Sequence, residues 1–415
     1  MEAIIARCAG LDIGKRQVQA CVRTPDPDDP TGGRRVQTRT FLTFTAGLEQ
    51  LADWLTNEQV TDVVMEATGQ YWKPVWYALE DHAFTLMLVN AQHVKILPGR
   101  KTDVADAAWL AELLEHGLLR GSFVPEPEIR RLRDLTRYRK KLVQTRTSEV
   151  QRLSKHLEDA GIKLDSVASD LLGVSGRAML AALVDGERDP AVLAELAKGR
   201  LRAKLPDLRE ALRGRFTDHH GFLVRVGLEH LAQLEHHIGE LDERVEELIG
   251  PFARARDHLM TIPGIGTRAA ANLIAEIGVD MTRFPTAAHL ASWACMCPGN
   301  NITGGKRKTG TTRRGNPWIR DLLVESAWSA SHTRDTYLRA QFWRLARRIG
   351  KKKAAVAVGH TILVIAWHLL STDTDYHDLG ADHYQHRHDN PRRARDRHIA
   401  ELQQLGYHVT ITPAA

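Results

Sequence analysis

The sequence predicts a protein of the α/β class, built from an α/β domain, a helical middle region and a mainly helical carboxyl-terminal domain. Strand patterns open the chain and then alternate with helix patterns, as in layered α/β domains. Two later segments keep apolar residues at a spacing of three or four, which is typical of long amphipathic helices. With 415 residues we expect domains at 1–123, 124–255 and 256–370, followed by a polar tail at 371–415.

The first domain is predicted to begin with three antiparallel strands. Two of them flank the turn sequence I-G-K-R, and the third follows a loop rich in Pro, Asp and Gly. We expect Thr45 to cap the helix that comes next. Alternating helices and strands then lead into a parallel part of the sheet. In chain order the predicted elements are strands 8–12, 17–23 and 36–43, a helix from 45, strand 62–66, helix 71–81, strand 85–89 and a helix from near 103.

The stretch G-R-K-T-D-V-A-D-A, residues 99–107, carries two acids three residues apart. If it opens a helix, Asp103 and Asp106 share a face and can reach a single cation. Such a pair is repulsive unless a metal ion or a proton compensates it. The alternative is an ordinary helix start, with Thr102 as the cap and the acids favoured by the helix dipole.

Two further acids end predicted strands of the same domain. Asp12 ends the first strand and Glu66 ends a central one. Ligands of open α/β sheets collect at the carboxyl ends of strands, so these acids can converge with Asp103 and Asp106. Converging carboxylates bind hard divalent cations, and a two-metal site supports in-line phosphoryl transfer. Taken singly, each acid is also explained as a turn or strand-end residue.

Positive charge is concentrated in one segment of the chain. Residues 301–353 carry 14 Lys or Arg against three Asp or Glu, a net +11, whereas the other residues carry 43 against 48, a net −5. Such a concentration indicates a polyanionic partner, and nucleic acid is the first candidate. We expect a cytoplasmic, nucleoid-associated protein without a membrane partner, because the sequence has neither a signal-peptide pattern nor an apolar run of spanning length. The four cysteines are expected to be reduced, buried thiols.

Four motifs of the first domain closely resemble the DEDD-type transposases of the insertion-sequence one-ten family, which are relatives of the Piv-type invertases. The motifs are L-D-I-G-K with Asp12, M-E-A-T-G-Q-Y-W with Glu66, N-A-Q-H-V-K from Asn90, and K-T-D-V-A-D-A with Asp103 and Asp106. The resemblance implies a RuvC-like domain of the RNase H fold whose four acids bind magnesium, as two ions, with manganese as an alternative. It also implies a structured noncoding RNA, a bridge RNA that pairs with donor and target DNA.

The middle region is expected to form coiled-coil arms. Residues 129–160 lack Gly and Pro and carry ten Lys or Arg, among them Arg137, Lys140 and Lys141. A long basic helix is either a solvated face or a surface that follows phosphates, and both interpretations stay open. Residues 221–249 keep an apolar seam that packs against the first helix or against another subunit. Residues 161–220 predict shorter helices.

The segment L-M-T-I-P-G-I-G-T-R-A-A-A-N-L-I-A-E-I-G, residues 259–278, has the form helix, turn, helix and resembles a helix-hairpin-helix unit. Gly264 and Gly266 allow close approach of the backbone, and the next helix presents N–H groups to a phosphate. Such a unit grips the DNA backbone without reading sequence. A plain helical hairpin is the alternative.

A glycine-rich basic loop follows Cys297 and is expected to hold cations against phosphates. A nonspecific basic loop is the alternative. The candidate phosphate ligands are Lys306, Arg307, Lys308, Arg313, Arg314 and Arg320, with Lys101 from the first domain.

The loop also holds the candidate nucleophile. In the one-ten family, which residues 261–330 resemble, the matching loop carries a serine that attaches to DNA, and this chain has Thr303 at that position. A threonine hydroxyl can attack phosphorus, although its methyl group restricts the approach. Thr309 and Ser326 are weaker candidates for the covalent role.

The last part of the chain predicts packing rather than chemistry. Trp328, Tyr337, Phe342 and Trp343 alternate with arginines, but aromatic residues at helical spacing are expected in a core. Residues 354–370 predict a buried apolar helix. The tail contains His377, His383, His386 and His388, whose irregular spacing favours a surface segment over a metal site.

Three functions follow as hypotheses. The first is a transposase that recombines element ends or a junction with target DNA, through a covalent hydroxyl–DNA link, as a dimer or tetramer. The second is a RuvC-like nuclease or junction resolvase that uses a metal-activated water. The third is a nonenzymatic nucleic-acid-binding remnant, against which the four intact acids argue.

Overall fold

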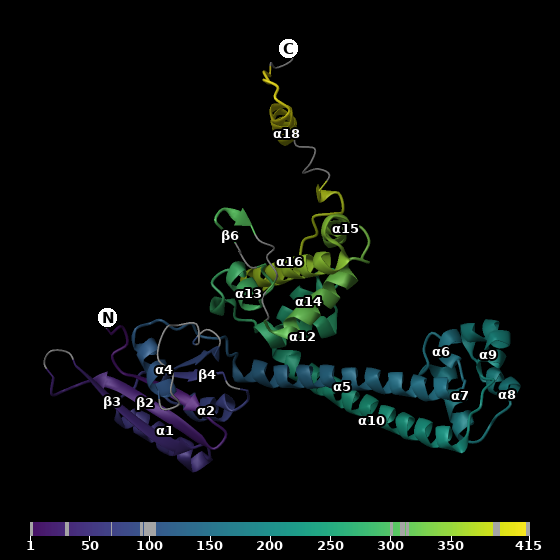
Figure 1. Cartoon of the computed structure of the whole chain (residues 1–415), viewed down its shortest axis with the longest axis horizontal. Helices are drawn as coiled ribbons and strands as arrows, with labels where there is room; N and C mark the ends of the chain where they lie inside the picture. Colours follow the sequence, from purple (N-terminus) through teal and green to yellow (C-terminus); the bar gives the residue numbers. More distant parts are fainter. Residues whose placement is uncertain are drawn as a thin grey trace. The chain divides into compact units, whose positions relative to one another are not determined.

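The computed structural model describes residues 3–29, 33–67, 69–91, 94, 105–298, 302–307, 312, 315–384 and 391–411. The chain divides into two compact units (Figure 1). Unit 1 is Met1–Val124 and unit 2 is Pro125–Ala415.

Unit 1 is built on a mixed sheet of five strands in the order β3-β2-β1-β4-β5. The first three strands pair antiparallel, and β1 continues through β4 to β5 in parallel, as predicted. The strands are β1 (Cys8–Ile13), β2 (Gln17–Pro25), β3 (Arg34–Leu42), β4 (Asp62–Glu66) and β5 (Thr85–Val89). The α/β class predicted from the sequence is confirmed.

Helices cover both faces of this sheet (Figure 1). Helices α1 (Thr45–Asn57) and α2 (Trp72–Leu79) bury Leu51 and Leu79 against Leu11 of β1. Helix α4 (Ala105–Glu115) packs on the opposite face, against Cys8, Val64 and Val89. Thr45 is the first residue of α1 rather than its cap; Phe44 occupies the cap position, where its side chain supplies no hydrogen bond.

Two long helices dominate the first part of unit 2. Helix α5 (Pro127–Asp159) and helix α10 (Asp218–Ile249) run antiparallel along each other, with Arg139 bonded to Asp242 near one end and Asp159 beside His220 at the other. The seam of the second helix therefore packs against the first helix of the same chain, the first of the two predicted alternatives. Short helices connect the pair: α6 (Leu164–Val167), α7 (Val174–Val184), α8 (Pro190–Glu195), η1 (Gly199–Lys204) and α9 (Leu205–Ala211).

The rest of unit 2 is almost entirely helical. Its core surrounds α16, from which Val358, Ile362 and Leu363 are fully buried. The elements are η2 (Gly250–Phe252), α11 (Ala253–Met260), α12 (Thr267–Ile277), η3 (Met281–Arg283), α13 (Ala287–Trp293), β6 (Ile302–Thr303), β7 (Lys306–Arg307), α14 (Pro317–Ala330), α15 (Tyr337–Ile349), α16 (Lys351–Thr372) and α18 (Pro391–Gln404).

Helix α16 is the one described helix that is long and apolar enough to cross a membrane. Glycine at position 359 lets it approach the backbone of α14, where an added Cβ would lie 3.0 Å from the Leu323 carbonyl oxygen. Its buried residues face α14 and α15, so α16 has the position of a core helix, as predicted for residues 354–370.

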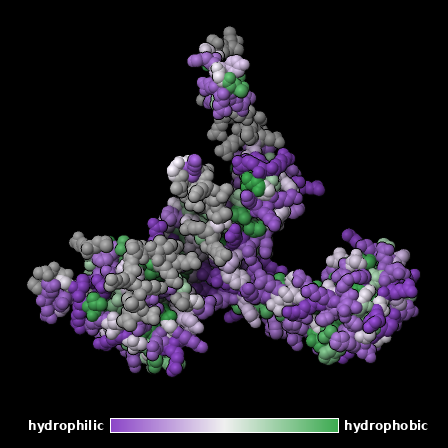
Figure 2. Space-filling view, viewed as in Figure 1, coloured by the Kyte–Doolittle hydropathy of each residue, from purple (hydrophilic) through white to green (hydrophobic). Residues whose placement is uncertain are grey.

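The surface of the described residues is mainly polar on the face in Figure 2, with apolar side chains in small separate groups. Cys8 and Cys21 are buried, as predicted, but Cys295 and Cys297 are only partly buried, because they lie beside the basic loop rather than in a core. All four are free thiols. The aromatic residues are split in the same way: Phe342 is fully buried, whereas Trp343 is 37% exposed.

Candidate functional site

Two of the candidate acids lie side by side at the carboxyl edge of the sheet. Strands β1 and β4 are parallel neighbours, and their last paired residues are Leu11 and Met65. Asp12 and Glu66 are the next residue on each strand. Because neighbouring strands are about 4.8 Å apart, this register places the two carboxylates next to each other.

Both acids face the side of the sheet that α4 covers. Side chains alternate along a strand, and Leu11 and Met65 belong to the core under α1 and α2. Cys8 lies four residues before Asp12 on β1, and Val64 lies two residues before Glu66 on β4, so each shares a face with that acid. Both belong to the core under α4. Asp12 and Glu66 therefore point to the α4 face, and both are partly buried.

Helix α4 packs on the face of the sheet to which these acids point. It approaches β1 so closely at Gly10 that an added Cβ would lie 2.3 Å from the Ala107 carbonyl oxygen and 2.5 Å from the Ala111 nitrogen. Asp106, in the first turn of α4, precedes Ala107. Gly10 and Asp12 share a face of β1, so α4, with Asp106 in its first turn, covers the face of the sheet to which Asp12 and Glu66 point.

The fourth acid and the metal can be judged only in part. Asp103 and Lys101 lie outside the described residues. Among the described residues, no three His, Cys, Asp or Glu side chains are close enough together to hold a metal ion. The oxygen donors of Asp12, Glu66 and Asp106 nevertheless have the chemistry that Mg²⁺ or Mn²⁺ requires.

The far end of α4 is fixed by a buried ion cluster. Glu115 is 2% exposed and lies 2.8 Å from Arg23 of β2 and 2.5 Å from Arg34 of β3. The thiol of Cys8 donates a hydrogen bond to the Ala111 carbonyl on the same helix. Burial and the nearby Glu115 carboxylate raise the pKa of Cys8 to about 12. These contacts hold α4 in one position on the sheet and thereby position Asp106.

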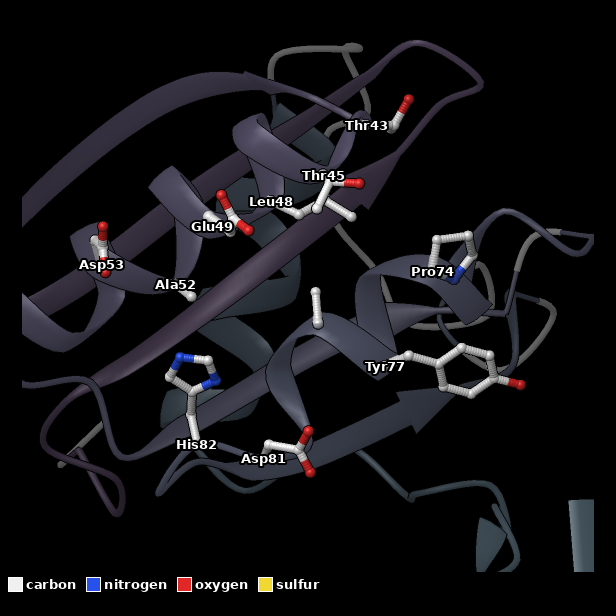
Figure 3. Close-up of a pocket in the computed structure, with 11 residues that line it drawn as sticks. Thr43, Thr45, Leu48, Glu49, Ala52, Asp53, Pro74, Tyr77, Asp81 and His82 are labelled. Carbon is white, nitrogen blue, oxygen red and sulfur yellow. The ribbon is translucent and has the colours of Figure 1, made fainter.

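A groove in unit 1 lies on the opposite face. It has a volume of about 490 Å³ between α1 and α2, and Figure 3 shows Glu49, Asp53 and Asp81 around its rim. Its lining residues come from the α1 and α2 layer. The groove is therefore separate from the candidate acids, and its negative charge disfavours nucleic acid.

The predicted helix, turn, helix unit is present in unit 2. Helices α11 and α12 flank the turn. Its two glycines differ in their surroundings. Gly264 has a φ of +91°, and an added Cβ there would lie 2.4 Å from the Ser326 carbonyl of α14. Gly266, the cap of α12, has no other atom within 4 Å of such a Cβ and is exposed. Gly264 thus serves packing, and Gly266 is the glycine that leaves room for a phosphate.

The basic loop contains a two-stranded hairpin. Thr303 ends β6 and pairs with Lys306 of β7 across Gly304 and Gly305, which both have positive φ. Lys306 is exposed. The backbone of Arg307 lies in β7. Of the other predicted loop residues, Lys308, Thr309, Arg313 and Arg314 lie outside the described residues.

The end of the loop is held by α14. Arg320 donates a hydrogen bond of 2.8 Å to the Thr312 hydroxyl, so it supports the loop from within. Asn316 caps α14 by accepting from the Trp318 nitrogen at 2.9 Å. Ser326 is 3% exposed, which removes it from reach of DNA. Thr303 stays the candidate nucleophile.

The cations predicted on α5 gather around one tryptophan. Arg137, Lys140 and Lys141 lie 5.5, 5.9 and 5.4 Å from the centre of the Trp318 ring. Arg137 is also bonded to both oxygens of Glu276, at 2.7 and 2.8 Å, and Lys140 pairs with Asp321. Lys141 is exposed and forms no ion pair within the described residues. Arg137 and Lys140 of α5 therefore form ion pairs within the protein.

Glu276 is a residue that the sequence analysis missed. It is 3% exposed, on α12, and accepts from Arg137 of α5 and from the Asn316 amide at 2.5 Å. Arg133 donates to the carbonyl oxygens of Ala275 and Glu276, and burial lowers its pKa to about 10. The sequence feature that could have indicated Glu276 is a single glutamate within the apolar run L-I-A-E-I. Glu276 joins α5, α12 and the end of the basic loop.

Two sequence models of transposase families match the chain over these regions. The DEDD_Tnp_IS110 transposase domain matches residues 9–162, and the Transposase IS116/IS110/IS902 family matches residues 256–344. The chain is a member of the IS110 family of transposases. The first match contains all four predicted acids, and the second contains Thr303 and the turn at Gly264.

Individual relatives agree with this membership. The IS110-family chain is 24% identical over 380 residues to the transposase for insertion sequence element IS1111A of Coxiella burnetii, covering 88% of this chain and 90% of the relative. It is 26% identical over 304 residues to the pilin gene-inverting protein of Moraxella lacunata, covering 71% and 73%. A 72-residue stretch, 17% of this chain and 18% of the relative, is 50% identical to an IS110 insertion element protein of Streptomyces coelicolor.

The IS110-family transposase is an enzyme that acts on DNA, so its function lies in DNA recombination and transposition. Its DEDD-type domain implies dependence on a divalent metal ion. The enzyme hypothesis drawn from the sequence is confirmed, and the hypothesis of a nonenzymatic remnant is not retained.

Proposed function

We propose that this transposase cuts and rejoins DNA with metal-binding carboxylates of unit 1 and a threonine nucleophile of unit 2. The carboxylates are Asp12, Glu66, Asp103 and Asp106 in a RuvC-like arrangement, and the nucleophile is Thr303. The observation that supports the proposal is the adjacency of Asp12 and Glu66 at the sheet edge, on the face that α4, with Asp106 in its first turn, covers.

The carboxylates would hold Mg²⁺, as two ions, with Mn²⁺ as the alternative. When bound, the metal supplies charge stabilisation to the attacked phosphate and lowers the pKa of a coordinated oxygen. The chain's own contribution is position: Gly10 and Glu115 fix α4 on the sheet, which keeps the first turn of α4, with Asp106, on the face to which Asp12 and Glu66 point.

The Thr303 hydroxyl would attack the scissile phosphorus. A bond forms between Oγ1 and phosphorus, the bond from phosphorus to the leaving sugar oxygen breaks, and that oxygen takes up a proton. A DNA hydroxyl later displaces the threonine in the reverse sense. The phosphothreonyl link conserves the energy of the broken bond, which strand exchange requires.

Nucleic acid would be held mainly by backbone contacts. The candidates are the amino terminus of α12 at Gly266, the loop cations Lys306, Arg307, Lys308, Arg313 and Arg314, Lys141 on α5, and Lys101. Contacts of this kind carry no sequence information, so a structured noncoding RNA that pairs with donor and target DNA would supply specificity. Joining two DNA sites calls for a dimer or tetramer. The domains at 1–123, 124–255 and 256–370 would each take part, with the long helix pair of the second domain as a coiled coil.

A trap for protein bound covalently to DNA tests the proposal. Purified protein, Mg²⁺, junction DNA of the element and its candidate RNA are analysed on a denaturing gel beside Asp12→Asn and Thr303→Ala. We expect a slowly migrating adduct that both substitutions abolish, whereas Thr303→Ser keeps it.

A different outcome would support the second function predicted from the sequence. Cleavage without an adduct, lost in Asp12→Asn but retained in Thr303→Ala, means that water is the nucleophile. The enzyme would then cut as a nuclease or junction resolvase, and the covalent step would be wrong.

A further inference from the structure

Helices α15 and α16 meet at a strongly basic corner of unit 2. Helix α15 ends with Arg347 and Arg348, Gly350 turns the chain with a φ of +82°, and α16 begins with three lysines. The basic corner consists of five exposed side chains: Arg347, Arg348, Lys351, Lys352 and Lys353.

No described residue neutralises these charges. Within the described part of the chain, none of the five forms an ion pair or a side-chain hydrogen bond, and residues 339–353 contain no acid. Most cations of α5 differ in this respect, since Arg137, Arg139 and Arg146 each have a carboxylate partner. The charge of the basic corner is therefore available to a ligand.

The three lysines lie at the amino-terminal end of a helix, where positive charge lowers stability. Arg347 and Arg348, in the last turn of α15, are favoured by the helix dipole, but Lys351, Lys352 and Lys353 lie in the first turn of α16, where cations are disfavoured. Lys352 and Lys353 have no compensating contact within the described residues, and a local rule broken in this way indicates a functional constraint.

A fixed aromatic ring lies beside the corner. The Trp343 indole donates a hydrogen bond of 3.2 Å to the Ser331 carbonyl, and Lys351 lies 5.4 Å from its ring centre. The ring is 37% exposed. Exposed cations next to an accessible aromatic face are typical of surfaces that bind nucleic acid.

We propose that the basic corner binds the phosphate backbone of duplex DNA. DNA is the committed partner because the family acts on it. The five cations lie beyond residue 344, where the second family match ends. The basic corner needs neither the carboxylates nor Thr303 nor a guide RNA.

Binding of the full-length protein to a labelled duplex of arbitrary sequence tests the proposal. Fluorescence anisotropy is measured over a series of salt concentrations for Lys351→Gln/Lys352→Gln/Lys353→Gln. Asp12→Asn is included in every protein, so cleavage and the outcome of the adduct experiment do not affect the result. The matched control, Arg200→Gln/Arg213→Gln/Arg215→Gln, removes three exposed cations from the η1 and α9 region.

We expect the lysine variant to raise Kd by roughly tenfold or more near physiological salt and to lower the slope of log K against log salt by about 2.7, the value for three phosphate contacts. The control should change Kd by less than about twofold. The melting temperature of the lysine variant should be unchanged or higher, because substitution removes charges that oppose the helix dipole.

Unchanged affinity and slope in the lysine variant would overturn the proposal. An equal loss in the control would also overturn it, since net charge rather than position would then explain the binding. A loss confined to an RNA duplex, or to vesicles of anionic lipid, would assign the basic corner to a different partner.

Discussion

At the scale of single residues, glycines and buried acids decide how closely helices pack against the sheet and against one another. Gly10 brings the α4 backbone against β1, on the face of the strand that also carries Asp12. Any side chain at position 10 would meet the backbone of Ala107 and Ala111, which cannot move without the rest of α4. Gly264 serves α14 in the same way, while Gly266 stays open toward solvent.

The thiol of Cys8 is expected to be unreactive in the folded transposase. Its pKa of about 12 leaves almost no thiolate at pH 8, and the side chain is fully buried. Cys21 is also buried, and burial raises its pKa. In a timed alkylation at pH 8, we expect Cys295 and Cys297 to be modified first, and all four cysteines only in denaturant. Rapid labelling of Cys8 in the native protein would contradict the packing of α4.

The raised pKa of Cys8 also makes the free energy of unfolding depend on pH in the alkaline range. The pKa of Cys8 is about 12 in the folded state against 9.0 for the unperturbed thiol, so the native state binds the proton more tightly. This contribution is complete below pH 9 and is lost as the pH rises toward 12. The expected direction is a lower free energy of unfolding at higher pH, and Cys8→Ala should flatten that dependence.

At the scale of elements, Glu276 links α12 to α5 and to Asn316, the cap of α14, through one buried carboxylate. Removing its charge leaves Arg137 without its bidentate partner and Arg133 with less compensation in a buried position. We expect Glu276→Gln to destabilise the protein by about 3–5 kcal/mol, as measured by urea denaturation. The Asn316 contact is weakened as well, so the end of the basic loop should lose its fixed position.

A surface pair provides the control for this prediction. Glu247 pairs with Arg244 on α10, and both side chains are more than half exposed. Glu247→Gln should change stability by no more than about 1 kcal/mol. Equal effects at the two sites would mean that the buried cluster does not stabilise the contact between α5 and α12.

At the scale of the whole molecule, the candidate metal-binding carboxylates and most of the candidate phosphate contacts belong to different units. The carboxylates belong to unit 1, whereas the basic loop, Lys141 and the basic corner belong to unit 2. This division explains how a chain with a net charge of only +6 carries a segment of +11. Negative charge is needed where metal ions bind, and positive charge where phosphates bind.

Removal of divalent metal should therefore separate the two activities. With EDTA we expect DNA cleavage to be lost, while Kd for duplex DNA changes by less than about threefold, because phosphate contacts by Lys and Arg need no metal. Added Mg²⁺ or Mn²⁺ should raise the melting temperature of the wild-type protein but not of Asp12→Asn, since binding to the folded state stabilises it. Loss of DNA binding in EDTA would contradict this division.

The sequence by itself determined the order and type of most elements. Strands 62–66 and 85–89 were predicted with the bounds that the structure has, and the two long helices begin two or three residues earlier than predicted and end within one residue of the prediction. Apolar periodicity is a local property, and each element buries its own apolar face, so the pattern can be read from the chain alone. Family motifs pointed to the four acids, but no spacing in the sequence places Asp12 beside Glu66.

Only the tertiary structure decided which residues meet. The strand register put Asp12 next to Glu66, and the approach of α4 to Gly10 placed the helix that carries Asp106 on the same face of the sheet. Gly264, predicted to admit a phosphate, lies against α14, and Arg137, predicted to contact nucleic acid, is bonded to Glu276. These outcomes depend on contacts between residues more than fifty positions apart, and local sequence patterns contain no information about such contacts.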